Sequence, residues 1–352
     1  MRRMIAPQLL AWWDKHGRKH LPWQKDRAPY RIWVSEIMLQ QTRVETVTPY
    51  FERFMASFPD VQALAAAEAD DVLAIWAGLG YYTRAHNLLK AARIVVVQHG
   101  GDVPRDFESL VALPGIGRST AGAILALAHG QRRAILDGNA RRVLARVYGV
   151  EGWPGKASVS SRLWNLAETN TPSERVRDYT QAIMDLGATV CLRRNPRCDA
   201  CPLAESCRAR KHDLTAEIPA AKPKANRPLR HRSMLVVQRP DGAVLLHRRP
   251  PTGIWAGLWC LPTLDDGESA GDWCARVLGC SPQRDAELVP VRHSFSHFEL
   301  EIRPIHLPVS TSPAGIREDD QWRWHDGRQE LGMPAPIRRL VESLEVGAEG
   351  SR

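Results

Sequence analysis

The feature that most constrains this chain is a run of four cysteines within seventeen residues. They are Cys191, Cys198, Cys201 and Cys207, separated by six, two and five residues. Four thiolates on so short a segment are typical of one compact metal centre, either tetrahedral zinc or a [4Fe–4S] cluster. Zinc ribbons carry two separated CxxC pairs, whereas this segment has a single CxxC between two longer arms. The spacing therefore favours the cluster over zinc.

The remaining cysteines, Cys260, Cys274 and Cys280, are scattered, and we interpret them as small buried apolar side chains rather than disulfide partners. The first residues, MRRMIAPQLLAWWDKHG, mix charges with tryptophans, unlike a secretory signal. No apolar run approaches the roughly 20 residues that a membrane span needs. We therefore expect a cytoplasmic protein with no membrane segment.

At 352 residues the chain is long enough for two domains. Residues 1–212 are rich in alanine and leucine, and their apolar positions recur at helical spacing, which predicts an all-α domain. Residues 213–230 contain three prolines and no apolar periodicity, so we expect an extended linker there.

Beyond the linker the pattern changes to that of strands. Segments 233–238 and 243–249 flank a Pro-Asp-Gly turn and predict a hairpin, and FELEIR at 298–303 alternates as a half-buried strand does. Residues 335–346 predict an amphipathic helix. We expect an α+β domain over residues 231–345, followed by a tail over 346–352.

Residues 113–122, LPGIGRSTAG, predict the turn of a helix–hairpin–helix motif that extends over about 108–130. Gly115 and Gly117 permit a reversal with positive φ, and a helix resumes at Arg118. The N–H groups at the start of that helix suit a phosphate oxygen, so all three residues are candidate DNA contacts. An ordinary turn between two helices has the same pattern. The net charge of +9 favours a polyanionic partner.

The segment YRIWVSEIMLQQT predicts a helix whose one acidic residue is Glu36. Three and four positions away lie Ile32, Trp33, Leu39 and Gln40, three of them apolar. If this face is buried, the pKa of Glu36 rises and the carboxyl group stays protonated, ready to act as a general acid. A glutamate that faces solvent is the alternative.

Taken together, these motifs carry a resemblance. A helix–hairpin–helix followed by Asp137 and a C-x6-C-x2-C-x5-C loop resembles the DNA glycosylase superfamily that includes endonuclease III. SEIMLQQT, GLGYY and the C-terminal domain are similar to MutY-type adenine DNA glycosylases, over about residues 8–345. The resemblance implies an all-α helix–hairpin–helix glycosylase domain with a [4Fe–4S] loop at 191–207, plus a C-terminal α+β Nudix-like domain that recognises 8-oxoguanine.

The resemblance also implies a reaction in base excision repair. A monomer acting on double-stranded DNA would hydrolyse the N-glycosidic bond of adenine mispaired with 8-oxoguanine or guanine. Glu36 would protonate adenine at N7, Asp137 would stabilise the charge that develops on the sugar, and Asn139 would help to orient the sugar or water. From the local pattern alone, Asp137 beside Gly138 is a helix cap.

Ser119 distinguishes this chain from the relatives that cut the DNA strand. Those relatives place a lysine there, in a GxGRKT pattern, whereas this chain reads GIGRST. Because a serine hydroxyl cannot form a Schiff base, the resemblance implies little or no strand cleavage. A hydrogen bond at the helix N-terminus is the alternative role for Ser119.

The resemblance assigns further contacts to DNA. Gln41 and Tyr81 would fill the gap left by an extruded nucleotide. Phe295, Ser296 and His297, in the segment HSFSHF, would inspect 8-oxoguanine opposite the target. A turn between two strands would produce the same aromatic segment.

Other functions compete with this interpretation. A bifunctional pyrimidine-lesion glycosylase and AP lyase of the endonuclease III type is disfavoured by Ser119 and by the additional domain. A non-catalytic, redox-sensing iron–sulfur DNA-binding protein would make Glu36 and Asp137 dispensable. Hydrolysis of nucleotides by the Nudix-like domain is disfavoured because DDGESAGDWCARVLG, after Gly257, lacks the spaced glutamates that bind Mg²⁺.

Overall fold

The computed structural model of the chain describes residues 4–223, 226–279, 285–295, 297–309 and 319–349. Internal contacts divide it into two compact units. The first, which we call the helical unit, comprises Met1–Ala66 and His86–Lys224. The second, the sheet unit, comprises Ala67–Ala85 and Ala225–Arg352.

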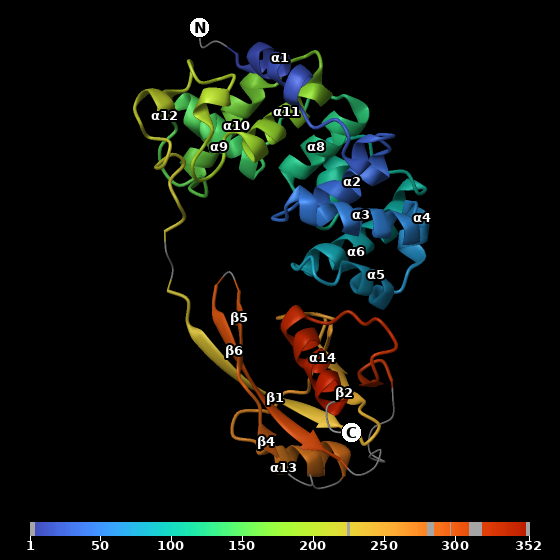
Figure 1. The fold of residues 1–352 in the computed structure, drawn as a ribbon. Helices are drawn as coiled ribbons and strands as arrows, with labels where there is room; N and C mark the ends of the chain where they lie inside the picture. The colour runs from blue at the N-terminus through green and yellow to red at the C-terminus, as the bar shows by residue number, and fades with distance from the viewer. Residues whose placement is uncertain (1–3, 224–225, 280–284, 296, 310–318, 350–352) are drawn as a thin grey trace. The chain divides into compact units, whose positions relative to one another are not determined.

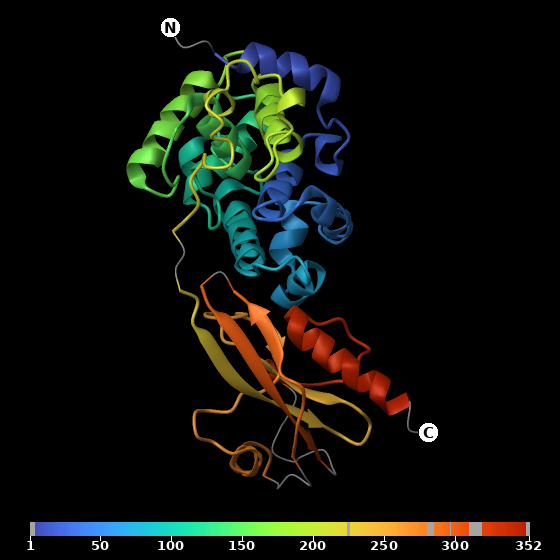
Figure 2. The same ribbon diagram turned by 60° about the vertical axis from the view of Figure 1, so that its left-hand side comes forward.

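The region before the linker is helical, as its apolar periodicity predicts (Figures 1 and 2). In chain order its helices are α1 (Ala6–His16), α2 (Pro29–Met38), α3 (Val44–Ser57), α4 (Val61–Ala66), α5 (Ala69–Trp76), α6 (Thr83–His99), α7 (Phe107–Ala112), α8 (Arg118–His129), α9 (Gly138–Tyr148), α10 (Ala157–Asn170), α11 (Val176–Thr189) and α12 (Arg208–Lys211). Helix α11 packs against α1, α8 and α9, while α2 packs against α3 and α8. The helices α2, α8 and α9, which carry the candidate site, are therefore held in one core.

The helix–hairpin–helix lies where the sequence predicts it, with α7 and α8 on either side of the turn. Gly115 has φ of +81°, which favours glycine. Gly117 differs from expectation, because its φ is −91°, an extended value open to any residue. Gly117 is the N-cap of α8, a position where the chain is extended before the helix begins.

A mixed sheet forms the core of the sheet unit. Its strands are β1 (Leu229–Gln238), β2 (Val244–Arg248), β3 (Trp259–Cys260), β4 (Ala286–Glu287), β5 (Val291–Ser294), β6 (Glu299–Pro308) and β7 (Trp322–His325). The main order is β3-β2-β1-β6-β4, with β5 paired to β6 and β7 to β2. The predicted hairpin is present, since β1 and β2 are antiparallel, while β1 and β6 run parallel.

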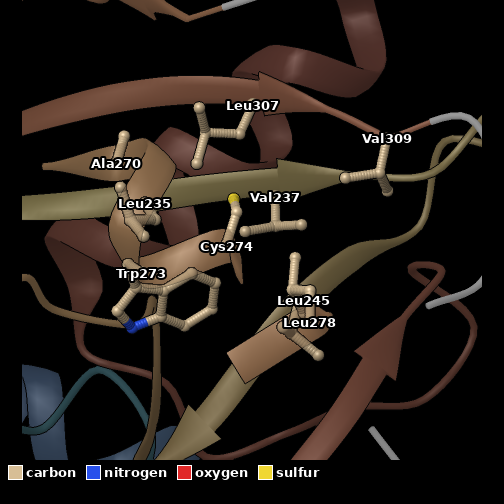
Figure 3. Close-up of a cluster of buried hydrophobic side chains, with 9 residues drawn as sticks. All are labelled: Leu235, Val237, Leu245, Ala270, Trp273, Cys274, Leu278, Leu307 and Val309. Carbon is tan, nitrogen blue, oxygen red and sulfur yellow. The ribbon is translucent and has the colours of Figure 1, made fainter. Parts of the chain in front are cut away.

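Apolar side chains from the sheet and from a short helical segment form a common core (Figure 3). Its members are Leu235 and Val237 of β1, Leu245 of β2, Ala270 and Trp273 of α13 (Ala270–Trp273), Cys274 and Leu278 after it, Leu307 of β6, and Val309. Helix α14 (Ala335–Glu349) confirms the predicted amphipathic helix. Cys274 is buried in this core, in agreement with the sequence interpretation.

Across the part of the chain that the structure describes, no helix combines the length and the apolar character that crossing a membrane requires.

Helices α9 and α11 approach closely at Gly187. A Cβ at this position would lie 2.5 Å from the Cβ of Asn139 and 2.8 Å from its Cα. We predict that Gly187→Ala lowers the free energy of unfolding by about 1–3 kcal/mol, because backbone must move to admit a methyl group. Urea titration followed by helical circular dichroism measures this. Gly271→Ala is the control, because that helical glycine has only Ser269 Oγ, 3.7 Å from a built Cβ, within reach. An unchanged urea midpoint for Gly187→Ala would contradict the close approach.

Candidate active site and iron–sulfur loop

Helix α2 places Glu36 in the interior of the helical unit. Pro29 occupies the first turn, where its missing N–H costs nothing. Ile32 and Trp33, four and three residues before Glu36, are buried, as the periodicity predicts. Glu36 itself is half-buried. Its carboxyl group therefore lies on a mostly apolar helix face.

The surroundings of Glu36 favour its neutral form. Burial, and to a smaller extent the negative charge of Asp137, raise the pKa of Glu36 to about 8. The carboxyl group is therefore mostly protonated at neutral pH and can donate a proton. The structure also brings the two predicted carboxylates within electrostatic range of each other.

Asp137 is the N-cap of α9. Its Oδ1 accepts a hydrogen bond from the Ala140 N–H at 2.8 Å, and its Oδ2 accepts one from the Asn139 N–H at 3.1 Å. These contacts and the positive end of the helix dipole hold a negative charge at this point. The cap suggested by the local pattern is thus present, and it fixes a carboxylate beside the neutral Glu36.

Ser119 does not play the helix-terminal role that the sequence suggested as an alternative. Helix α8 has no side-chain cap, and the Ser119 Oγ instead accepts a hydrogen bond from the Leu136 N–H at 3.0 Å. Leu136 immediately precedes Asp137. The hydroxyl therefore ties the start of α8 to the segment that carries the catalytic candidate.

Arg142, which the sequence analysis missed, connects Asn139 to the cysteine loop. Its Nη2 donates to Asn139 Oδ1 at 2.9 Å and to the Gly187 carbonyl at 2.6 Å, while its Nε donates to the Cys191 carbonyl at 2.6 Å. Asn139 is therefore anchored to this guanidinium. A movement of Cys191 would be transmitted to the start of α9 through a single side chain.

The four cysteines line one small cavity of about 20 Å³. Arg146, which is 3% exposed, donates from Nη1 to Cys191 Sγ at 3.3 Å and to the Leu192 carbonyl at 2.6 Å. It also donates to the carbonyls of Thr215 and Ile218, at 2.7 and 2.9 Å, so it ties the segment after the loop to α9. Within the described ranges, no group of three or more His, Cys, Asp or Glu is placed to hold a single metal ion. The four thiols thus line one shared space.

A larger cavity of about 380 Å³ lies in the same unit. Its lining includes Ile32 of α2 and Leu127 of α8, with Trp23, Lys19 and Gln181. Ile32 lies one helical turn before Glu36, so the two side chains share a face of α2. Sequence analysis gave no signal for this cavity, because its walls come from segments far apart in the chain.

Gln181 is oriented by a buried carboxylate at the cavity wall. Asp185 accepts hydrogen bonds from Gln181 Nε2 at 2.9 Å, from the Arg18 backbone N–H at 2.8 Å, and from Trp13 Nε1 at 3.2 Å. A carboxylate only accepts, so the amide nitrogen of Gln181 must face Asp185. Its carbonyl oxygen is then the amide atom turned away from Asp185.

The candidate DNA contacts lie in distinctive local conformations. Gln41 is exposed with φ of +62°, a left-handed value that is unusual for a residue with a Cβ. Arg118 pairs with Glu168, and its guanidinium carbon lies 3.9 Å from the Trp164 ring centroid. In this structure Arg118 is therefore held against α10. Tyr81, in the sheet unit, is 53% exposed with φ of +51°.

The segment HSFSHF joins β5 to β6 in the sheet unit. The Phe295 ring stacks on Phe298 at 4.6 Å and lies 5.6 Å from Trp255, while His297 packs edge-on against Phe298 at 4.7 Å. Ser296 lies outside the described residues. An aromatic cluster thus backs the two described candidates, Phe295 and His297.

Three protein-family models match different segments of the chain. A model of HhH-GPD superfamily base excision DNA repair proteins matches residues 34–169, and one of the iron-sulfur binding domain of endonuclease III matches residues 191–207. A NUDIX domain model matches residues 233–343. The matches confirm the predicted fold class, a helix–hairpin–helix domain with an iron–sulfur loop and a C-terminal Nudix-like domain.

Individual proteins match over nearly the whole chain. An adenine DNA glycosylase of Buchnera aphidicola (subsp. Schizaphis graminum) is 37% identical over 341 residues, 96% of this chain and 98% of that protein. The adenine DNA glycosylase of Homo sapiens is 36% identical over 398 residues, 94% of this chain and 72% of that protein. Among solved structures, a thermostable thymine-DNA glycosylase matches with a TM-score of 0.53 and 29% identity, over 59% of this chain and 95% of that one.

The raised pKa of Glu36 predicts a specific dependence of stability on pH. Its ordinary value is 4.5, so between pH 4.5 and about 8 unfolding releases a proton, and folding stability falls as pH rises. Glu36→Gln lacks this proton, so its stability relative to the wild type should increase through that window, by at most about 1.4 kcal/mol per pH unit. Urea titrations of both proteins across the window measure the difference.

The matched control is Glu52→Gln, which changes an exposed glutamate of α3. Its free energy of unfolding should vary with pH in the same way as that of the wild type. Parallel curves for Glu36→Gln as well would show that Glu36 ionises normally in the folded protein.

Proposed function

The chain belongs to the adenine DNA glycosylases, a family of helix–hairpin–helix base excision repair enzymes, and on that premise we propose that it hydrolyses the glycosidic bond of adenine paired with 8-oxoguanine or guanine and leaves the DNA strand uncut. The observation that carries the reaction is a half-buried Glu36 on a mostly apolar helix face, whose pKa is raised to about 8 by burial and by the charge of Asp137.

Glu36 supplies the proton for the leaving base. In the proposed reaction its carboxyl group protonates adenine at N7, so that the base departs neutral as the bond from the sugar to N9 breaks. Proton donation of this kind accelerates a reaction by about 10²–10⁴-fold, and this is the contribution that we expect from Glu36. A carboxyl group with an ordinary pKa would already be ionised at neutral pH and could not serve.

Asp137 stabilises the sugar cation that remains after the base has left. The sugar acquires oxocarbenium character as the base leaves, and a fixed carboxylate lowers the energy of that charge. Water then adds to the sugar carbon and gives up a proton to the ionised Glu36 carboxylate, which leaves an abasic site and restores the acid. The arrangement parallels glycoside hydrolysis, in which one carboxyl group is the acid and another stabilises the cation. Asn139, anchored by Arg142, orients the sugar or the water.

The 380 Å³ cavity is the proposed binding site of the extruded base. A flat, partly apolar wall from Trp23 and Ile32 suits a purine ring. The carbonyl oxygen of Gln181 accepts a hydrogen bond from an exocyclic amino group, as on adenine, and repels the keto oxygen of guanine. We therefore expect the cavity to bind adenine in preference to guanine, in agreement with the name of the family.

Ser119 supports hydrolysis without strand cleavage. The endonuclease III-type alternative needs an amine that attacks the sugar carbon, and the group at this position is a hydroxyl that holds the Leu136 N–H. The abasic product should consequently be released with its backbone intact.

Contacts to the duplex complete the proposal. Gly115, Gly117 and the backbone N–H groups at the start of α8 bind a phosphate, while Gln41 and Tyr81 occupy the space of the extruded nucleotide. In the sheet unit, the segment from Phe295 to His297 recognises 8-oxoguanine on the opposite strand, with aromatic rings that stack on a base.

We propose that the iron–sulfur group is held by Cys191, Cys198, Cys201 and Cys207, which line one cavity within the segment that matches the iron–sulfur binding domain. We propose a [4Fe–4S] cluster, because the cysteine segment has a single CxxC between two longer arms, unlike the two separated CxxC pairs of a zinc ribbon. When bound, the cluster would cross-link the loop. Arg146 and Arg142 then connect the loop to the body of α9.

We further propose that residues 1–212 carry base removal, residues 213–230 link the domains, and residues 231–345 carry lesion recognition. The enzyme works as a monomer in the cytoplasm, where DNA holds it at the nucleoid. The net charge of +9 supports this partner.

Excision assays test the reaction. The wild type should yield an abasic site from duplexes with adenine opposite 8-oxoguanine or guanine, and not from a panel of other mispairs. Glu36→Gln should bind the same duplex but lose at least about 10²-fold in single-turnover rate. Alkali-treated gels measure excision, and untreated gels should show an intact strand.

Glu52→Gln should retain full excision. No abasic product from the wild type would refute the proposed function, and full activity in Glu36→Gln would remove Glu36 from its role. Strand breaks without alkali, together with a borohydride-trapped adduct, would refute the hydrolytic, lyase-free mechanism.

Iron analysis tests the cluster. Cys198→Ser should lose the brown visible absorbance and most of the iron, because three thiolates hold the cluster poorly. Cys260→Ser, which alters a buried cysteine of the sheet unit, should retain both. Zinc instead of iron in the wild type would contradict the cluster assignment.

A further inference from the structure

The segment between α5 and α6 presents Tyr81 in an energetically costly conformation. Tyr81 has φ of +51° and is 53% exposed, immediately after Gly80 with φ of +69°. A left-handed backbone is ordinary for glycine and unfavourable for tyrosine, because the Cβ crowds the following carbonyl. An exposed ring gains little from burial to offset this cost. Neighbouring groups must therefore hold the conformation.

Arg84, in the first turn of α6, and Trp76 hold the backbone at Tyr81 with hydrogen bonds. It is 8% exposed, and its Nη2 donates to the carbonyls of Gly80 at 3.1 Å and Leu79 at 3.3 Å. Trp76 Nε1 donates to the same Gly80 carbonyl at 3.2 Å. The peptide unit that precedes Tyr81 is thus held by two donors, which fixes the backbone on which Tyr81 turns.

The same guanidinium contacts the ring of Tyr81. Its central carbon lies 5.4 Å from the Tyr81 centroid and 5.4 Å from that of Trp76, within the range of cation–π attraction. Burial lowers the pKa of Arg84 only to about 10, so the side chain remains cationic at neutral pH. A single buried cation therefore holds both the backbone and the side chain of Tyr81.

We propose that Arg84 is a positioning residue, which sets Tyr81 in its left-handed conformation so that the ring is ready to enter the DNA duplex when a nucleotide is extruded. This inference rests on the proposed function, in which Tyr81 occupies that space. Preorganisation lowers the ordering cost of binding, so loss of Arg84 slows base extrusion and leaves proton transfer at Glu36 unaffected.

A double-mutant cycle tests the proposal on the full-length protein. Arg84→Lys keeps the charge but loses the planar guanidinium, whose Nη2 donates to two carbonyls. Arg84→Lys and Tyr81→Ala should each slow single-turnover excision about tenfold, and the double variant should be no slower than the slower single one. Fluorescence of 2-aminopurine beside the target adenine should report equally reduced unstacking in all three variants.

The matched control is Arg93→Lys. Arg93 lies on the same helix and donates to the Ala65 carbonyl at 3.1 Å, and its substitution should leave excision and unstacking unchanged. Where Arg84→Lys lowers the thermal midpoint substantially, Trp76→Phe, which removes the second donor to Gly80, replaces it in the cycle. Rate losses that multiply in the double variant, or normal unstacking in Arg84→Lys, would overturn the proposal. Absence of excision by the wild type would instead refute the proposed function, so the two failures are distinct.

Discussion

The site depends on the burial of Glu36 on the mostly apolar face of α2, which keeps its carboxyl group mostly protonated at neutral pH, and the negative charge of Asp137 adds to this effect. Two backbone N–H groups and the N-terminus of α9 face the Asp137 carboxylate and hold it in place. Other features of the helical unit keep the two carboxyl groups in position. Ser119 fixes the residue before Asp137, and the packing of α2 on α8 fixes the distance across which the two groups interact.

Much of this arrangement was predictable because it follows from local pattern. Apolar residues three and four positions from Glu36 predict a half-buried acid, and the spacing of the four cysteines predicts one shared centre. One detail of the hairpin was wrong. Positive φ was expected at both glycines, but Gly117 is an N-cap with an extended backbone. The sequence gave no sign of the contact that Ser119 makes, because its hydroxyl bonds to Leu136, seventeen residues away.

What the sequence concealed is a set of buried side chains whose partners are distant in the chain. In GNARRVLARVY, the arginines at positions 142 and 146 lie four residues apart, a spacing that by hydropathy alone indicates a solvent-facing stripe. Both instead point inward, because carbonyls at Gly187, Cys191 and Thr215 need donors. Sequence gives no position for those carbonyls, since the fold creates them.

Two of the residues with proposed contacts to DNA or base, Glu36 and Tyr81, carry unfavourable local terms. Glu36 costs stability because it is buried with its proton, and Tyr81 because its backbone is left-handed. Strain that a free surface residue could relax persists only where adjacent groups oppose relaxation. Arg84 does this for Tyr81 through carbonyls and a ring contact, as the tie between Ser119 and Leu136 does for the segment at Asp137. A relative that kept the contacting residues but lost these supports would retain the motif without the geometry. Matching the motif alone is therefore a weaker indication of this activity than matching the motif with its supports.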